Sequence, residues 1–450
     1  MNQLDIFLPC AAGVEAFLEA EVRRLVGADE PVRAVRAGVQ VRTSWRNAML
    51  LNLHSRLAQR VLVRLWNGRY RQEEDLYDAA SSVAWEIWFD PDQTLKVEIT
   101  AQHSPLKSLN FAALKIKDAV CDRFRAKRGE RPSVDTRWPD VRVFAHLTAD
   151  ELTLYIDTTG EPLFKRGWRE DKGDAPLKET LAAAMIAATG WDDQARAAES
   201  VDDIPPLYDP CCGSGTVVIE AAQMALNIAP GLQRRFAFEK LIPCQQHVWQ
   251  SLKDQAAKAR RQWPDGHSPI VFGSDVAFRM VDFAQRNAER AGVAFAVQLR
   301  GGDALERRPP TETPGVLLLN PPYGERIAAA GAAGQDARTR ASTRAAGGRA
   351  PRVFTVGANG AASASPAGRE GFQSSDGTES DSDTFFERLS AHWKSHYAGW
   401  TAWLLTPDSK LPGKMRFKAS RRVPLWNGPI ECRLFRFDLI ARGPRPTADE

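Results

Sequence analysis

The stretch Asp209-Pro-Cys-Cys-Gly-Ser-Gly-Thr216 decides the fold class. It lies between a short strand-like segment, LYD, and the helix-like run TVVIEAAQMALN. Glycines at 213 and 215 let the backbone turn tightly and approach a ligand closely, as strand-loop-helix nucleotide sites require. The loop is not a Walker phosphate loop, because no Gly-Lys-Ser/Thr follows, and Cys211 and Cys212 leave no full G-x-G-x-x-G. A tight turn without a ligand stays open as the alternative.

Strands and helices alternate around this loop. IVFGSD precedes the helix-like AFRMVDFAQRNAERAG, and VQLRGGD, GVLLLNPPY and TAWLLT indicate further strands. This alternation predicts a mostly parallel sheet with helices on both faces. Towards the end, VPLWNGPIECRLFRFDL indicates two strands joined at Asn427-Gly428, a turn that adds an antiparallel strand. We expect the catalytic part to span from about Lys165 to Ile440.

The first 157 residues show shorter α+β patterns. Residues 1–42 combine the strands LDIFLP and VRAGVQVRT with a helix between them. Residues 43–157 contain LKVEIT, a helix over 111–128, and the alternating runs VRVFAHL and ELTLYID, which predict a hairpin. The sequence therefore predicts two α+β modules, at 1–42 and 43–157, before a larger α/β domain at 158–442.

Composition narrows the class of protein. A chain of 450 residues is long enough for two or three domains, and 43% hydrophobic with 26% charged residues is ordinary for a globular protein. No signal peptide or membrane span is indicated. The six cysteines form no CxxC pair and no Cys/His cluster, so we expect no metal and a reduced, cytoplasmic protein. A net charge of +4 permits a nucleic-acid partner.

A second motif, Asn320-Pro-Pro-Tyr323, follows the apolar strand GVLLL. A base's exocyclic amine is a poor nucleophile, because its lone pair is delocalised into the ring. An amide oxygen and a backbone carbonyl can accept its two N–H protons and stabilise the positive charge that develops during methylation. Pro321 and its neighbour stiffen the backbone, and Tyr323 offers a face for stacking on an extruded base. Alone, the motif could be a proline-rich turn.

The two motifs are expected to meet at one edge of the sheet. In a doubly wound fold the ligand crevice lies outside the carboxyl ends of the strands, where strand order reverses. Asp275 ends the strand IVFGSD and is placed to bind ribose hydroxyls. Asp303 follows the next strand and is placed to accept a hydrogen bond from an adenine amine. Either aspartate is alternatively a helix N-cap.

Residues 328–383 break the pattern. Ala, Gly, Ser and Arg dominate this stretch, and it lacks the apolar periodicity needed to bury a core. We expect it to be largely disordered, either as a tolerated surface insertion or as a loop that contacts RNA.

These motifs, with RGWRE and APLKETLAAAM before them, resemble the THUMP-domain class I RNA methyltransferases, and among them the N-terminal halves of bacterial 23S rRNA guanine-N2 methyltransferases. The resemblance covers nearly the whole chain except 328–383, and Cys211 departs from a bulkier residue common in the family. It implies a ferredoxin-like segment, a THUMP module, and a Rossmann-like seven-stranded domain that transfers methyl groups from S-adenosylmethionine. It implies Asn320, Pro321 and Tyr323 as catalytic residues. The implied cofactor-binding residues are Thr180, Asp209, Cys212, Gly213, Gly215, Asp275 and Asp303.

The resemblance also gives a role to the basic side chains of the helix predicted over 111–128. Phosphate contacts from its side chains would position RNA without specifying sequence. An ordinary solvated helix face is the alternative for each residue. The candidate RNA-binding residues are Lys107, Lys115, Lys117, Arg123, Arg125, Lys127 and Arg128.

Four alternative functions differ in the chemistry that their sites require. The same (D/N)PPY chemistry serves a DNA adenine-N6 methyltransferase, and the same domains serve a tRNA guanine-N2 methyltransferase. A non-catalytic RNA-binding assembly factor would keep the fold as a scaffold, but the intact loops argue against it. A C5-pyrimidine methyltransferase is rejected, because it needs a nucleophilic cysteine at the catalytic strand end and Tyr323 stands there.

Overall fold

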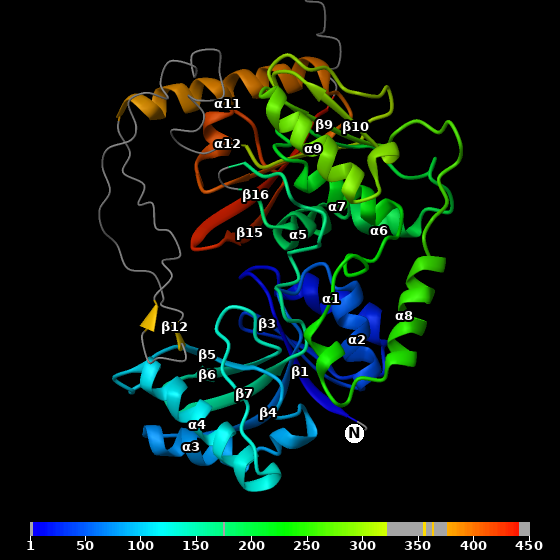
Figure 1. Cartoon of the computed structure of the whole chain (residues 1–450). Coiled ribbons are helices and arrows are strands. Elements are labelled where there is room, and N and C mark those ends of the chain that lie inside the picture. Colours follow the sequence, from blue (N-terminus) through cyan, green and yellow to red (C-terminus); the bar gives the residue numbers. More distant parts are fainter. Residues whose placement is uncertain (1–2, 174–175, 322–353, 357–361, 364–375, 441–450) are drawn as a thin grey trace, which may run out of the picture.

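The computed structural model of the chain describes residues 3–173, 176–321, 354–356, 362–363 and 376–440. These residues form two β-sheets, one built mainly from the N-terminal modules and one from the C-terminal domain. In Figure 1 the N-terminal sheet lies in the lower half of the molecule and the C-terminal sheet in the upper half.

The C-terminal sheet has seven strands, as the family resemblance implied. Five neighbouring strands run parallel, and the last two form an antiparallel hairpin. The hairpin turns at Gly428 and Pro429, one residue later than the predicted Asn427-Gly428, because Asn427 still pairs with Ile430. In spatial order the strands are β10 (Val297–Gly301), β9 (Val271–Asp275), β8 (Leu207–Asp209), β11 (Val316–Leu319), β14 (Thr401–Thr406), β16 (Ile430–Asp438) and β15 (Arg421–Asn427).

Helices cover both faces of this sheet, and β11 shows why. All four of its residues are buried, and successive side chains enter different cores: Leu318 packs in one hydrophobic cluster, Leu317 and Leu319 in the other. That is the alternation expected of a strand buried on both sides. The helices of this domain are α5 (Glu179–Thr189), α6 (Trp191–Ala197), α7 (Thr216–Ala225), α8 (Gln246–Lys258), α9 (Phe278–Arg290), α11 (Asp376–His396) and α12 (Leu411–Lys414).

The two N-terminal modules share one nine-stranded sheet. The predicted hairpin is confirmed, since Val143 to Leu147 pair antiparallel with the strand that ends at Asp157. In spatial order the strands are β13 (Ala362–Ser363), β12 (Phe354–Val356), β5 (Leu95–Ala101), β6 (Val141–Leu147), β7 (Glu151–Asp157), β4 (Leu62–Arg69), β1 (Leu4–Pro9), β3 (Gly38–Thr43) and β2 (Val32–Val35). The helices are α1 (Glu15–Val26), α2 (Trp45–His54), α3 (Glu73–Ser82) and α4 (Leu109–Arg128).

Residues 328–383 are expected to be largely disordered, and this stays a prediction; the structure describes only 354–356, 362–363 and 376–383 of the stretch. Strand β12 pairs with β5, and α11 begins at Asp376. Two physical reasons account for this: β5 presents unpaired backbone groups at the edge of the sheet, and extending a helix already anchored in the core costs little per residue. The remaining residues of 328–383 lie outside the described part.

Among the described residues, no helix combines the length and apolar character that a bilayer span requires. The same residues contain no group of three or more His, Cys, Asp or Glu side chains arranged to hold a metal ion.

Candidate active site

The loop after β8 has the conformation that its glycines permit. Gly213 and Gly215 have φ values of +53° and +89°, a region that residues with a Cβ adopt at a cost. A Cβ at 215 would lie 3.0 Å from the Cβ of Ala284 on α9, whereas a Cβ at 213 would meet no atom within 4 Å. Gly215 therefore allows close helix packing, and Gly213 borders open space.

Two carboxylates hold this loop. Asp275 Oδ2 accepts a hydrogen bond from the Gly213 backbone N–H at 3.0 Å, and Asp209 Oδ1 accepts one from the Cys211 N–H at 3.0 Å. Burial raises the pKa of Asp209 to about 8, with a further contribution from the nearby charge of Asp275. Burial also raises the pKa of Asp275. Both aspartates thus lie at the loop, and their role in binding a cofactor stays a prediction.

The other predicted cofactor residues lie close to the same strand ends. Cys212 is buried, and its backbone N–H bonds to the carbonyl of Ser274 at 2.9 Å. Thr180 is buried in the first turn of α5. Asp303 follows β10 and accepts a hydrogen bond from the Leu305 N–H at 2.9 Å, so it also caps a local turn. The alternative interpretation of Asp303 as a capping residue stays open.

The cofactor loop and the Asn-Pro-Pro motif lie at the same edge of the sheet. Strand β8 pairs directly and in parallel with β11, with Leu207 opposite Val316 and Tyr208 opposite Leu317. Parallel neighbours end at one edge, so the residues after Asp209 and after Leu319 face a common region. Asn320 is partly exposed there and Pro321 is buried. Tyr323 lies outside the described residues.

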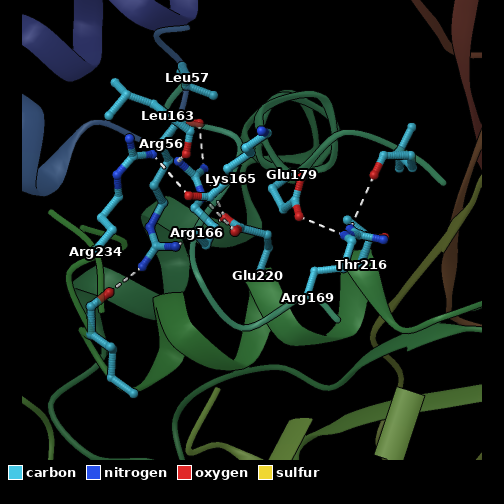
Figure 2. A network of polar contacts seen from close by, with 12 residues as sticks. Arg56, Leu57, Leu163, Lys165, Arg166, Arg169, Glu179, Thr216, Glu220 and Arg234 are labelled. Carbon is cyan, nitrogen blue, oxygen red and sulfur yellow. Dashed lines mark hydrogen bonds and ion pairs between the residues drawn. The ribbon is translucent and has the colours of Figure 1, made fainter. Parts of the chain in front are cut away.

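Arg169, from the RGWRE motif, braces the cofactor loop, a role that the sequence did not predict. Its guanidinium donates to the Glu179 carboxylate at 2.7 Å, the Ser214 hydroxyl at 3.1 Å and the Thr216 hydroxyl at 2.7 Å. Figure 2 shows it between Glu179 and Thr216. A partly buried arginine with several partners fixes geometry better than a single contact does. No sequence pattern reveals it, because its partners at 214 and 216 are far along the chain.

A second clamp joins the same segment to α9. Asn287 donates from Nδ2 to the backbone carbonyls of Ser214 and Asp171, at 3.0 and 2.8 Å. Asp171 pairs with Arg286 and Arg290, which lower the pKa of its carboxyl to about 2. The cofactor loop is therefore held by contacts with Arg169, which is itself bound to Glu179 of α5, and with Asn287 of α9. These contacts fix its conformation without a ligand.

Buried charges connect this domain to the N-terminal modules. Glu220 of α7 is fully buried and accepts from Arg166 at 3.0 Å and from Arg56 at 3.1 Å. Arg166 also donates to the backbone carbonyl of Arg56 at 2.8 Å. Figure 2 shows both arginines converging on Glu220. Because removing one partner would leave an unpaired buried charge, this network fixes how the modules meet.

Most candidate RNA-binding residues on α4 are engaged in ion pairs. Arg123 donates to both carboxylate oxygens of Glu86, at 2.8 and 2.7 Å. Lys115, Lys117 and Arg125 pair with Glu74, Asp118 and Asp122. Lys107, Arg125, Lys127 and Arg128 have exposed side chains. The RNA-binding role of these residues stays a prediction.

Three domain families match consecutive parts of the chain. Residues 5–62 match the RlmL ferredoxin-like domain, 70–157 the THUMP domain and 166–337 the RMKL-like methyltransferase domain. Together with the two sheets, these matches define the class of the domains: the chain combines a THUMP domain with an RMKL-like methyltransferase domain, as the resemblance indicated. The ferredoxin-like match runs to residue 62 rather than 42.

The relatives make the class more specific. A protein of Psychromonas ingrahamii named ribosomal RNA large subunit methyltransferase K/L is 34% identical over 98% of this chain, which covers 51% of that relative. The chain thus spans about half the length of the curated relatives it matches. In fold, it is similar over 99% of its length to the methyltransferase SMU.472 solved with SAH, covering all of that chain, with a TM-score of 0.76 and 24% identity. A structure titled as a predicted N6-adenine-specific DNA methylase of Listeria monocytogenes covers 97% of this chain and is itself covered to 96%, with a TM-score of 0.74 and 24% identity.

Proposed function

We propose that this chain transfers a methyl group from S-adenosylmethionine to the exocyclic N2 amine of a guanine in RNA, and that the RNA is 23S rRNA. One observation carries the proposal: β8 and β11 are hydrogen-bonded parallel neighbours, so the cofactor loop and Asn320 lie at one edge of the sheet. A methyl donor and a target amine held by these two loops lie within reach of each other.

The residues at the loop fit this cofactor. Open space beside Gly213 admits a ligand close to the backbone. The Asp275 carboxylate next to it suits ribose hydroxyls, which donate hydrogen bonds without adding charge. Thr180 and the backbone around Cys212 are assigned to the methionine side, and Asp303 to the adenine. When bound, S-adenosylmethionine supplies an electrophilic methyl group on a sulfonium.

On the substrate side, the chain's own groups act on the amine. We assign the Asn320 side-chain oxygen and the Pro321 carbonyl as acceptors for its two protons, and Tyr323 as the stacking face. Acceptors placed before the reaction stabilise the positive charge that develops on nitrogen. In this scheme no general base is needed before the new bond forms, because the amine carries only partial charge until then. The methylated nitrogen would afterwards release one of its two protons to water, which restores the neutral amine.

The cysteines at the site argue against a covalent mechanism. Cys211 and Cys212 lie in the cofactor loop, and burial together with neighbouring carboxylates raises the pKa of each thiol well above its ordinary value. A thiolate is the form that attacks a pyrimidine ring. All six cysteines are free, which supports a reducing, cytoplasmic location.

The choice of RNA rests on the N-terminal modules and on the relatives. The THUMP match and the rRNA methyltransferases at 34% identity favour rRNA over tRNA or duplex DNA. Solved structures at 24% identity support the fold and do not discriminate between these substrates.

The test is nucleoside mass spectrometry of rRNA, tRNA and DNA from cells that lack the protein, before and after incubation with the purified chain and S-adenosylmethionine. We expect N2-methylguanosine to appear in 23S rRNA. An Asp275→Ala variant serves as the control that should lose cofactor binding. N6-methyladenine in DNA, or N2-methylguanosine confined to tRNA, would replace the proposal with one of its rivals.

A further inference from the structure

The segment between β14 and β15 concentrates positive charge. From residue 410 to residue 422 the chain has six basic side chains and no acidic one. Arg421 and Arg422 lie in β15 opposite Arg436 and Phe435, which in turn lie opposite the middle of β14. These two arginines are therefore not at the end of the strand and do not belong to the surface described below. The remaining four residues define what we call the α12 basic surface: Lys410, Lys414, Arg416 and Lys418.

This surface lies at the edge of the sheet where the target base must enter. Strand β14 runs parallel to β11, with Leu404 opposite Leu319, so the chain leaves both strands at the same edge. α12 follows β14 after a short turn, and its Leu411 shares a hydrophobic cluster with Leu319, the residue before Asn320. Figure 1 shows α12 beside α11 at this side of the domain.

Arg416 is held in a strained backbone conformation. Its φ is +48°, and a residue with a side chain in this region costs about 1–3 kcal/mol. The flanking backbone is fixed by α11: the Ser390 hydroxyl donates to the Met415 carbonyl at 2.7 Å, and Lys394 Nζ donates to the Arg416 carbonyl at 3.1 Å. The Arg416 side chain is 83% exposed, so packing does not explain why a long cation stands where glycine would be less strained.

The exposed charges of Arg416 and Lys418 are weakly compensated, whereas Lys414 is partly buried and pairs with Asp408 at 3.1 Å. Arg416 reaches Glu387 only at 3.5 Å, and both side chains are largely exposed, so the pair contributes little. Lys418 is exposed and has no ion-pair partner among the residues that the structure describes. On α4, by contrast, Arg123 is held by both oxygens of Glu86. Positive potential is therefore better exposed beside the catalytic edge than along much of α4.

We infer that the α12 basic surface binds the RNA phosphates that flank the target nucleotide. The inference rests on the proposed function and extends it. The ends of β10, β9 and β8 are assigned to the cofactor, so the RNA chain on either side of an inserted base passes over the β14 side of Asn320. The exposed cations Lys410, Arg416 and Lys418, of which Arg416 has a backbone held by α11, match a sugar-phosphate backbone and carry no base specificity.

Neutralisation of two exposed cations tests this. Purified wild type and the double variant Arg416→Gln, Lys418→Gln are titrated with a 23S rRNA transcript at several salt concentrations. The equally exposed pair Lys258→Gln, Arg260→Gln at the end of α8 is the matched control, and α8 lies on the opposite flank of the molecule in Figure 1. We expect the test variant to bind about tenfold more weakly at low salt, with a log–log salt slope reduced by about one to two, while the control binds as wild type does.

A second variant separates charge from folding. Arg416→Gly removes the charge and relieves the backbone strain, so it should unfold no more easily than wild type and still bind RNA less tightly; Arg416→Lys should retain most of the affinity. Wild-type affinity and salt slope in the neutralised variant, or an equal loss in the α8 control, would overturn the inference. Loss of binding with no N2-methylguanosine formed by wild type would support the surface and refute the proposed function.

Discussion

At the scale of single residues, the site depends on a side chain that touches two parts of the cofactor loop at once. Arg169 joins Ser214 and Thr216 to Glu179 at the start of α5. Its effect is indirect, since it holds the loop in place. We therefore treat it as a positioning residue.

We expect Arg169→Gln to weaken S-adenosylmethionine binding about tenfold or more, because the cofactor loop loses the side chain that holds it. RNA affinity should stay near wild type, because the N-terminal modules are unchanged. Arg169→Lys should fall between the two, since an ammonium cannot reach all three partners. Calorimetric titration with the cofactor measures this. An additional Glu179→Gln change in the Arg169→Gln background removes the buried carboxylate that would otherwise lose its partner. Unchanged cofactor affinity in Arg169→Gln would show that the loop holds its shape without the arginine.

Asp209 makes stability depend on pH. Its folded-state pKa of about 8 lies above the ordinary value of 3.8, because burial disfavours the charged carboxylate. Because the folded-state pKa is raised, the contribution of protonated Asp209 to the free energy of unfolding is complete at pH values below the unfolded-state pKa. This contribution is lost as the pH rises through about 8. Urea unfolding at pH 5 and pH 8 should show wild type losing stability relative to Asp209→Asn, by at most about 1.4 kcal/mol per pH unit. A difference between the two proteins that is the same at both pH values would contradict this.

The residues found from sequence and those missed differ for a physical reason. The positions of Gly213, Gly215 and Asp275 at the loop were predictable from the sequence. A tight turn requires glycine, and an aspartate directly after a strand lies at the sheet edge. Arg169 and the pairing of Arg123 with Glu86 were not predictable, because they depend on which elements pack together across long stretches of chain.

At the scale of elements, parallel strands place the two motifs of the site at one edge of the sheet. The count of seven strands came from the family resemblance, whereas the alternation of strands and helices predicted a mostly parallel sheet with a closing hairpin. It did not predict β12, because three residues carry too little periodicity and their partner strand lies about 250 residues earlier. The boundaries at 42/43 and 157/158 stay predictions, and one continuous sheet crosses the first of them.

The basic face of α4 belongs to this scale. Arg125 and Lys127 are exposed near its C-terminus. Of these two side chains, only Arg125 forms an ion pair among the residues that the structure describes, an exposed one with Asp122 at 3.0 Å. Reversing both charges should weaken RNA binding mainly at low salt, since the interaction is electrostatic and screened. Filter binding at low and high salt measures it, and Arg123→Gln is a structural comparison because that side chain is tied to Glu86. A loss of binding independent of salt would indicate misfolding of the helix.

At the scale of the whole molecule, the modules meet through buried charge. Arg56 from the N-terminal part and Arg166 from the linker converge on Glu220, in the helix that begins directly after the cofactor loop. The THUMP-containing sheet is thereby held in a fixed relation to the catalytic edge. RNA that contacts both α4 and the α12 basic surface would then present a nucleotide to Asn320 with little rearrangement of the protein.

The most direct test of the central claim is single-turnover methyl transfer by Asn320→Ala with saturating cofactor and RNA. We expect the rate to fall about 100-fold or more while affinity for S-adenosylmethionine stays near wild type, because Asn320 acts on the amine and the loop binds the cofactor. Methyl transfer at the wild-type rate would contradict the account, since the amine would then be held somewhere else.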